Sequence, residues 1–351
     1  MKKNYFKKLV LDKKSSVKII VEISGNHQNN YSSLKKLVNQ AIRNGADIIK
    51  FQVYKPETIT FKSNSKDFKI EKQSKWSDYS NLFELYKDAH TPWDWIEKIS
   101  LYLNKIKFPW FASVFDKTSI EFLERLNCQA YKIASPEITD IGLIKEASKT
   151  NKPLILSTGV ASTDDLNLAV STIKKSHNMY AILKCTSSYP APFDELDLLS
   201  IQTIKSNYNC VVGFSDHSIG TIAAKTAVAL GATIVEKHFK LDNDDKSVDA
   251  HFSLDISKLK NLKREFHLVQ KTLGSNKIRV TKSAKRGQRG MRSLYVVKDI
   301  MKGEKFTNEN IKSIRPSFGL HPKHLDKFIN KKSTLSVKAG SRLKRNMIKK
   351  F

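Results

Sequence analysis

Cysteine and long apolar runs are scarce in this sequence, and each scarcity excludes a class of protein. The three cysteines, Cys128, Cys185 and Cys210, are widely spaced and form no metal-binding pattern. An odd number of cysteines without a secretion signal favours reduced thiols that act as small buried apolar side chains. No apolar run approaches the roughly 18 residues of a membrane-spanning helix, so we expect no membrane partner. The basic N-terminus lacks a following apolar stretch and a cleavage site, which predicts no signal peptide and a cytoplasmic location.

Acidic residues are also scarce, at 34 against 62 lysines and arginines, and the formal net charge is +28. Such a charge is common in nucleic-acid-binding proteins. Here the lysines are spread along the chain, and aromatic residues do not alternate with them as on a single-strand-binding surface. We therefore predict a solvated lysine-rich surface and no nucleic-acid partner. Part of the charge would attract an anionic substrate.

Short apolar runs alternate with helical patterns through the first two-thirds of the chain. This alternation predicts an α/β fold of parallel strands with helical crossovers, and eight strands favour a closed (β/α)8 TIM barrel. The expected strands cover residues 17–23, 47–53, 109–115, 129–135, 153–159, 180–186, 210–217 and 232–239. Active sites of such barrels are built from the C-terminal ends of the strands. Most of these runs end in polar or charged residues, which predicts where the site lies.

The sequence also predicts a lid segment within the barrel domain, a linker after it and a small C-terminal domain. Residues 54–90 form a long polar segment after the second strand, which we interpret as a lid over the site. The barrel is expected to cover residues 1–280, with a charged linker at 281–292 and a small domain at 293–351. Within that domain, residues 331–348 predict two strands joined by a turn. A domain of about 60 residues is close to the lower limit of independent stability, so it should lean on its own barrel or on a partner subunit.

Two histidines follow neighbouring expected strands. His217 comes just after the seventh strand and His238 ends the eighth, each near an acidic residue, Asp216 or Glu236. Two imidazoles with nearby carboxylates suit a divalent ion such as manganese, iron, cobalt or zinc. The alternative is that each histidine only hydrogen-bonds a loop. Their position at adjacent strand ends favours the metal interpretation.

Two lysines lie inside apolar strands, where a charge is unfavourable unless it is paired or faces a ligand. We expect Lys50 and Lys132 to point into the barrel mouth and to hold phosphate or carboxylate. A group of hydroxyls at strand ends would complete this anion site: Ser135, Ser157, Thr158 and Ser215. Two alternatives stay open, namely buried salt bridges with Glu22 or Glu236 and a Schiff-base lysine of an aldolase.

Three further residues are weaker candidates from the sequence alone. Glu22 ends the first strand and could orient a hydroxyl or move a proton, or could only pair with a buried lysine. Asp249 follows the eighth strand, although aspartates in loops usually face water. Arg315 lies in the small domain and could reach a site as a planar anion clamp, or could be a surface arginine.

The motifs together resemble the sialic-acid synthase family, whose members condense phosphoenolpyruvate with an N-acetylated amino sugar to make nonulosonic acids. The resemblance runs nearly end to end, and the tail is similar to the antifreeze-like (SAF) domain of that family. The motifs that carry it are VEISGNHQNN, GADIIKFQ, YKIAS, LILSTG, KCTSSYPAP, GFSDHSIG, ALGATIVEKHF and SLYVVKDIMKGEKFTNENIKSIRP. The implied enzyme class is a transferase.

The resemblance also implies roles for particular residues. It implies a domain-swapped homodimer in which each tail domain covers the partner's barrel, and a divalent ion, typically Mn²⁺, held by His217 and His238. The catalytic carboxylates would be Glu22 and Glu236. The phosphoenolpyruvate site would comprise Lys50, Gln52, Lys132, Ser135, Ser157, Ser187, Tyr189 and Ser215. The sugar site would comprise Glu22, Tyr189, Asp249 and, from the other subunit, Arg315.

Within the family, residues 82–95, 115–127, 187–198 and 315–325 are most similar to pseudaminic acid synthases. That subgroup uses a 2,4-diacetamido-2,4,6-trideoxy-altrose, whereas N-acetylneuraminate and legionaminate synthases are the alternatives. The chain departs from the family at Ser187, where Asn is frequent, and at residues 247–249, which read Ser-Val-Asp rather than Gly-Pro-Asp. The second change alters turn chemistry beside a presumed sugar contact, so it bears on the sugar more than on the reaction.

Overall fold

The protein is described here by a computed structural model that covers residues 5–13 and 15–351. Residues 1–4, part of the N-terminal stretch that we interpret as carrying no signal peptide, lie outside these ranges. The described chain divides after Gly274 into two compact units. The first unit holds the barrel, and the second is a small domain that begins at Ser275.

Eight parallel strands of the first unit pair in chain order, and β1 also pairs with β8, so the sheet closes into a barrel. The closure confirms the predicted (β/α)8 architecture. The strands are β1 Lys18–Glu22, β2 Ile48–Val53, β3 Trp110–Val114, β4 Tyr131–Ile133, β5 Leu154–Ser157, β6 Tyr180–Cys185, β7 Val211–Asp216 and β8 Ile234–Lys240, and the short β9 Leu254–Asp255 pairs with the end of β8. The register places Glu22 beside both Lys50 and His238. The strand ends therefore bring candidate residues together.

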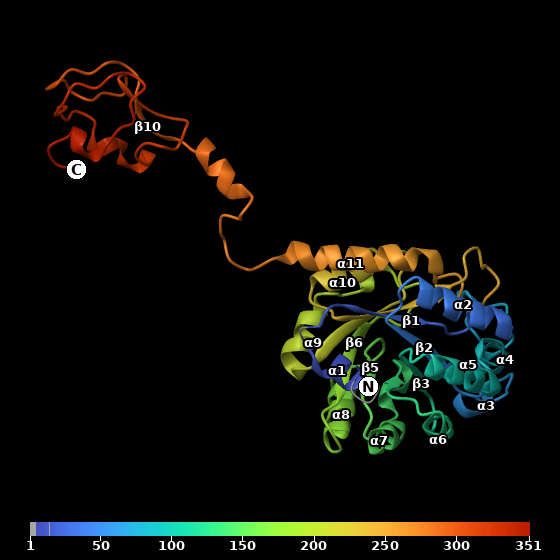
Figure 1. The fold of residues 1–351 in the computed structure, drawn as a ribbon. Helices are drawn as coiled ribbons and strands as arrows, with labels where there is room; N and C mark the ends of the chain where they lie inside the picture. The colour runs from blue at the N-terminus through green and yellow to red at the C-terminus, as the bar shows by residue number, and fades with distance from the viewer. Residues whose placement is uncertain (1–4, 14) are drawn as a thin grey trace. The chain divides into compact units, whose positions relative to one another are not determined.

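Helices surround the barrel, and from α6 to α11 their labels follow one another around it in chain order (Figure 1). They are α2 Tyr31–Arg43, α3 Pro56–Ile59, α4 Leu82–Ala89, α5 Trp93–Lys105, α6 Lys117–Arg125, α7 Ile141–Lys149, α8 Thr163–Lys174, α9 Ser200–Tyr208, α10 Ile222–Ala229 and α11 Leu259–Leu273. Several begin at side chains that accept hydrogen bonds from free backbone N–H groups, including Asn30 before α2 and Asp116 before α6. The longer crossover helices bury one apolar face, as α2 does with Leu34, Leu37, Val38 and Ala41. In the described part of the chain no helix is both long and apolar enough to cross a membrane.

The end of the barrel where the strands begin is covered by helix α1 (Tyr5–Leu11). Phe6 of α1 is buried and lies 5.6 Å from the ring of Phe111. Next to it, Asp47 accepts a hydrogen bond from the backbone of Ile19 and forms an ion pair with Lys263 at 3.0 Å. This end is filled by apolar packing and structural contacts, which leaves the opposite end for a site.

The long segment after β2 lies at that opposite end, as its position in the sequence predicts. It contains α3, a 3₁₀ turn at Lys66–Phe68 and α4. Its side chains Ile70, Trp76 and Tyr86 line the pocket described below. Trp76 donates a hydrogen bond from Nε1 to the carbonyl oxygen of Val248 at 2.9 Å, so the segment is attached to the loop that follows β8.

The second unit has its own small core around Leu294, Phe306 and Phe328. Its regular strands, β10 Ser293–Val296 and β11 Ile311–Ile314, are antiparallel. The two strands that we expected on either side of the turn at Ala339-Gly340 do not pair with each other. Val337 bridges to Ile300 and Arg342 bridges to Tyr295, so the expected strands are present only as isolated bridges, and the turn joins two remote pairings.

A substitution in the barrel wall tests this packing. A Cβ atom at Gly213 of β7 would lie 2.5 Å from both the Ile234 carbonyl oxygen and Leu183 Cδ2, closer than any van der Waals contact. We expect Gly213→Ala to lower the free energy of unfolding by about 1–3 kcal/mol, measured by urea denaturation. Gly287→Ala is the control, because no atom lies within 4 Å of its added methyl group, and should change stability by about 0.5 kcal/mol or less. Equal stability of the two variants would contradict the close packing of the wall.

Candidate active site

A pocket of about 590 Å³ opens at the C-terminal ends of the barrel strands. Most of the residues that the sequence predicts for the site line it: Lys50, Gln52, Lys132, Ser135, Ser157, Tyr189, Ser215, His217, Glu236, His238 and Asp249. Glu22 is fully buried and contacts Lys50 from the first strand. Ser187 lies beside Gly159 in the loop after β6. Arg315 belongs to the second unit and follows β11.

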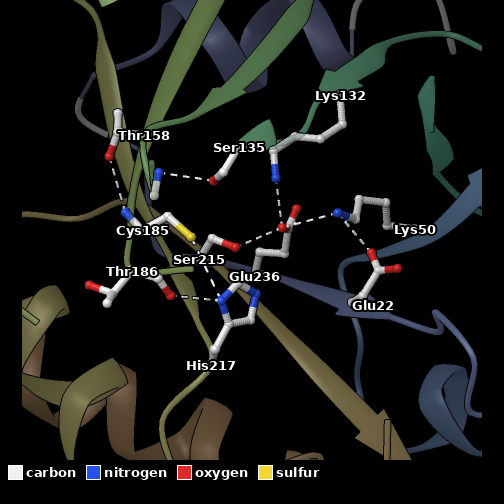
Figure 2. A network of polar contacts seen from close by, with 11 residues as sticks. Glu22, Lys50, Lys132, Ser135, Thr158, Cys185, Thr186, Ser215, His217 and Glu236 are labelled. Atoms are coloured by element: carbon white, nitrogen blue, oxygen red, sulfur yellow. Dashed lines mark hydrogen bonds and ion pairs between the residues drawn. The ribbon is translucent and has the colours of Figure 1, made fainter. Parts of the chain in front are cut away.

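Glu236 is the centre of the charged network in the pocket (Figure 2). Lys132 Nζ donates to its Oε1 atom at 2.7 Å, and Lys50 Nζ lies 3.0 Å from the same oxygen. Ser215 Oγ donates to that oxygen as well, at 2.9 Å. Glu22 Oε2 lies 2.9 Å from Lys50 Nζ, although neither of its oxygens has a well-directed hydrogen bond among the described residues. The buried salt bridges and the inward-facing ammonium groups, treated as alternatives in the sequence, therefore occur together.

Burial and neighbouring charges together determine the pKa values of Lys50 and Glu236. Burial lowers the pKa of Lys50 to about 7, because desolvation disfavours the ammonium form more than the charge of Glu236 favours it. Burial by itself would raise the pKa of Glu236, but the positive charges of Lys132 and Lys50 outweigh it and hold this pKa below the usual range. An arriving anion would stabilise the ammonium form of Lys50 further.

Several hydroxyl groups near the lysines are buried without a partner in the described structure. The Oγ atoms of Ser157 and Ser187 are of this kind. Ser135 Oγ accepts a hydrogen bond from the backbone N–H of Gly159 at 2.9 Å. Gly159 has no room for a side chain, because a Cβ atom there would lie 2.1 Å from Ser187 Oγ. Buried hydroxyls without partners are unfavourable unless a ligand satisfies them, so the cluster fits an oxyanion such as phosphate or carboxylate.

His217 and His238 lie side by side at the pocket, with ring centroids 5.3 Å apart. His217 Nδ1 is 3.1 Å from the carbonyl oxygen of Thr186. When Nδ1 donates there, Nε2 keeps the lone pair that can bind a metal. His238 Nδ1 is buried without a hydrogen bond among the described residues and lies 3.9 Å from Asp249 Oδ2. Burial, helped by the nearby His217, holds the pKa of His238 well below its usual value, so its ring is neutral as a ligand must be.

These two imidazoles fit a divalent ion with an incomplete protein ligand set. The described residues contain no cluster of three or more histidine, cysteine, aspartate or glutamate side chains in ligating positions. A metal held by His217 and His238 would therefore keep positions for water and substrate oxygens, as a catalytic rather than structural metal does.

The remaining wall of the pocket is formed by Asp249 and aromatic rings. Asp249 Oδ2 accepts a hydrogen bond from the backbone N–H of Gly25 at 3.1 Å, and burial raises its pKa to about 6. The ring of Tyr189 lies 4.4 Å from that of His217, and Trp76 contacts Tyr189 from the lid segment. A carboxylate beside aromatic faces suits a ligand with both hydroxyl groups and apolar surface, such as a sugar.

Sequence reasoning missed one acidic residue of the pocket. Glu137 lies in the 3₁₀ turn Pro136–Thr139 after β4 and lines the cavity. Its Oε2 atom is buried without a partner in the described structure, and burial raises its pKa to about 7. A carboxyl group with that pKa exchanges protons near neutrality. Its position just after a strand end was the available signal, but only the serine of that segment was considered a candidate.

Cys185 also lies closer to the candidate metal ligand His217 than the sequence predicts. It is buried as predicted, but it lines the pocket, and its Sγ atom lies 3.7 Å from His217 Nδ1. The Nδ1 atom of His217 therefore has a thiol beside it in addition to the Thr186 carbonyl oxygen.

The network predicts a titration at Lys50. Selective ¹³C labelling of lysines, with assignment by Lys50→Arg, should show Lys50 titrating near pH 7. Glu236→Gln removes the charge that raises this pKa, so the midpoint should move to lower pH. Asp47→Asn, at the other end of the barrel, is the control and should leave the midpoint unchanged. If Lys50 titrated near pH 10.5 in the unsubstituted protein, the burial of its ammonium group away from water would be contradicted.

Comparisons with known proteins agree with this geometry. Residues 37–278 match the NeuB family, and residues 291–349 match the SAF domain. A pseudaminic acid synthase of Campylobacter jejuni subsp. jejuni serotype O:2 is 40% identical over 334 residues, which cover 95% of this chain and 96% of that protein. A pseudaminic acid synthase of Helicobacter pylori is 37% identical, with 93% of this chain and 96% of that protein covered.

More distant relatives include other synthases. An N,N'-diacetyllegionaminic acid synthase of Campylobacter jejuni is 33% identical over 91% of this chain and 96% of that protein. Among solved structures, an N-acetylneuraminic acid synthetase from Leptospira borgpetersenii in complex with citrate superposes with a TM-score of 0.68 at 30% identity, covering 78% of this chain and 90% of that one. The chain therefore belongs to the NeuB family of sialic acid synthases, enzymes that join a sugar to phosphoenolpyruvate, and carries a SAF domain after its barrel.

Proposed function

We propose that this protein is a pseudaminic acid synthase, a transferase that condenses phosphoenolpyruvate with 2,4-diacetamido-2,4,6-trideoxy-altrose and releases phosphate. The observation that carries the proposal is the pair Lys50 and Lys132, which share one carboxylate oxygen of Glu236 in the pocket that the adjacent imidazoles of His217 and His238 also line. The near full-length similarity to two pseudaminic acid synthases supports the choice of sugar.

Phosphoenolpyruvate would bind where the lysines and unsatisfied hydroxyls meet. Its phosphate and carboxylate replace part of the charge that Glu236 now supplies to Lys50 and Lys132. Ser157 and Ser187, whose Oγ atoms have no partner among the described residues, would donate hydrogen bonds to phosphoenolpyruvate. Gln52, Ser135 and Ser215 complete the proposed site. Donors held in place before the reaction stabilise developing charge without reorganisation.

His217 and His238 would hold the divalent ion, which we propose to be Mn²⁺. A bound ion of this kind supplies Lewis-acid polarisation of the sugar aldehyde. These imidazoles and Asp249 line the same pocket as the residues of the proposed anion site. Asp249, Tyr189 and Glu22 would orient the sugar hydroxyls, and Glu22 also contacts Lys50 Nζ at 2.9 Å.

Bond formation then follows from these positions. Carbon 3 of phosphoenolpyruvate attacks the aldehyde carbon, water adds at carbon 2, and the tetrahedral species loses phosphate by cleavage of the C–O bond. Glu137, whose pKa is raised to about 7, is the group in the pocket suited to transfer a proton to or from these oxygens. Glu236 remains ionised throughout, because its pKa is held low by two lysines, and it orders them rather than donating a proton.

The second unit has a separate part in the proposal. Arg315 would enter the sugar site of a partner subunit in a domain-swapped homodimer, with residues 281–292 as the linker and 1–280 as the barrel domain. A small domain whose core comprises few residues gains stability when it docks on another surface. We also propose a cytoplasmic location, where phosphoenolpyruvate is available.

A phosphate-release assay tests the reaction, the sugar and the metal together. We expect phosphate release from phosphoenolpyruvate to be fastest with the 2,4-diacetamido altrose, slower with N-acetylmannosamine, and abolished by a chelator until Mn²⁺ is added back. His238→Ala should reduce turnover by about 10²–10³-fold, since a Lewis acid contributes several kcal/mol, while circular dichroism shows an intact fold. Faster release with N-acetylmannosamine would replace the proposed sugar. Borohydride trapping of a lysine adduct without phosphate release would replace the reaction by Schiff-base chemistry.

Subunit mixing tests the role of Arg315. Homodimers of Glu236→Gln and homodimers of Arg315→Ala should each be inactive or nearly so. Mixed dimers contain one site with an intact barrel and an intact partner arginine, so they should recover up to about a quarter to a half of the normal activity, depending on exchange. Surface Arg345→Ala is the matched control and should be active by itself. Absence of recovery in verified mixed dimers would contradict the swap.

A further inference from the structure

A buried ion pair connects the two strands that carry the histidines, on the face turned away from the pocket. Asp216 of β7 and Lys237 of β8 are register partners, and Lys237 Nζ lies 2.8 Å from Asp216 Oδ2. Both side chains are 0% exposed. The pair is therefore fully removed from water and bridges adjacent strand ends.

Ser218 joins this pair to the loop after β7. Its backbone N–H and its hydroxyl donate to Asp216 Oδ1 at 2.9 and 2.7 Å. Lys237 Nζ in turn donates to the Ser218 carbonyl oxygen at 2.7 Å. The loop is thus held against both strands by hydrogen bonds to charged groups, which are stronger than neutral ones.

Strand alternation explains why this pair bears on the pocket. Side chains of successive strand residues point to opposite faces. Asp216 and Lys237 point outward, and the residues immediately after them, His217 and His238, line the pocket. A change in the spacing of these two strand ends would move both imidazoles at once.

Stability alone does not account for such a pair. Burying two charges has a large desolvation cost, and apolar side chains of similar volume often give equal or greater stability. A buried pair does, however, fix relative position, because its attraction falls away when the partners shift. The hydrogen bonds of Ser218 restrict that position further.

We propose that Asp216, Lys237 and Ser218 form a positioning clamp that sets the separation of His217 and His238 and thereby the affinity of the site for its divalent ion. The inference rests on the proposed function at one point, the binding of a metal by the two imidazoles. None of the three clamp residues belongs to the proposed substrate or metal sites, so they act through the histidines.

The chain offers a matched control at the other end of the barrel. Asp47 precedes β2, accepts a hydrogen bond from the Ile19 backbone and pairs with Lys263 at 3.0 Å. Its carboxylate, like that of Asp216, links a strand (β1, through Ile19) to a neighbouring element (α11, through Lys263). Asp47→Asn should therefore lower stability without reaching the histidines.

Calorimetric titration of the full-length protein with Mn²⁺ alone tests the clamp. We expect Asp216→Asn to raise the Kd for Mn²⁺ by about 10–100-fold, the usual effect of removing a partner that orients metal ligands. Ser218→Ala, which removes one hydrogen bond and keeps the ion pair, should raise it about threefold to tenfold. Turnover of both variants should recover when Mn²⁺ is raised above the new Kd, a recovery that general unfolding would not give. Asp47→Asn should keep the normal Kd.

Each outcome decides between explanations. An unchanged Kd in Asp216→Asn, together with reduced stability in urea, overturns the clamp and leaves the pair a structural feature. If Asp216→Asn does not fold, an unchanged Kd in both Ser218→Ala and Lys237→Arg overturns it equally. His238→Ala tests the metal site independently of the clamp. If the unsubstituted protein binds Mn²⁺ no better than this variant, the proposed metal site is wrong, and the clamp proposal is wrong as well.

Discussion

The structure depends on the neutralisation of two ammonium groups at the mouth of a closed barrel. Lys50 and Lys132 come from β2 and β4, and both are almost completely buried. Charges in that position are tolerated only when partners replace the lost water. Glu236 from β8 provides the shared partner, and it can reach both lysines because closure of the sheet brings their strands around one axis. Barrel closure and charge compensation therefore support each other.

The same arrangement prepares the pocket for an anion. One carboxylate oxygen serves two lysines and a serine hydroxyl, so the donors outnumber the acceptor groups they share. Nearby hydroxyls of Ser157 and Ser187 lack partners in the described residues. In the proposed function, phosphate or carboxylate of the substrate would accept hydrogen bonds from these donors, which the barrel already holds in place.

Much of the barrel and of the pocket lining could be predicted because both follow from strand periodicity. An apolar strand that contains a lysine, such as the one around Lys132, indicates an inward-facing charge from residue order alone. Glu137 escaped this reasoning because it lies in a 3₁₀ turn, where no period indicates which way a side chain points. The two strands expected on either side of Gly340 are only isolated bridges, for another reason. Local alternation identifies extended chain, but the partners Ile300 and Tyr295 are distant in sequence.

The attachment of the lid segment has a consequence for how this family can diversify. Trp76 bonds to the main-chain oxygen of Val248 and not to its side chain. Every amino acid, proline included, offers that acceptor. A substitution at position 248 of this chain therefore keeps the acceptor for Trp76. The side chain at this position can therefore vary while the lid segment stays attached to the loop that follows β8.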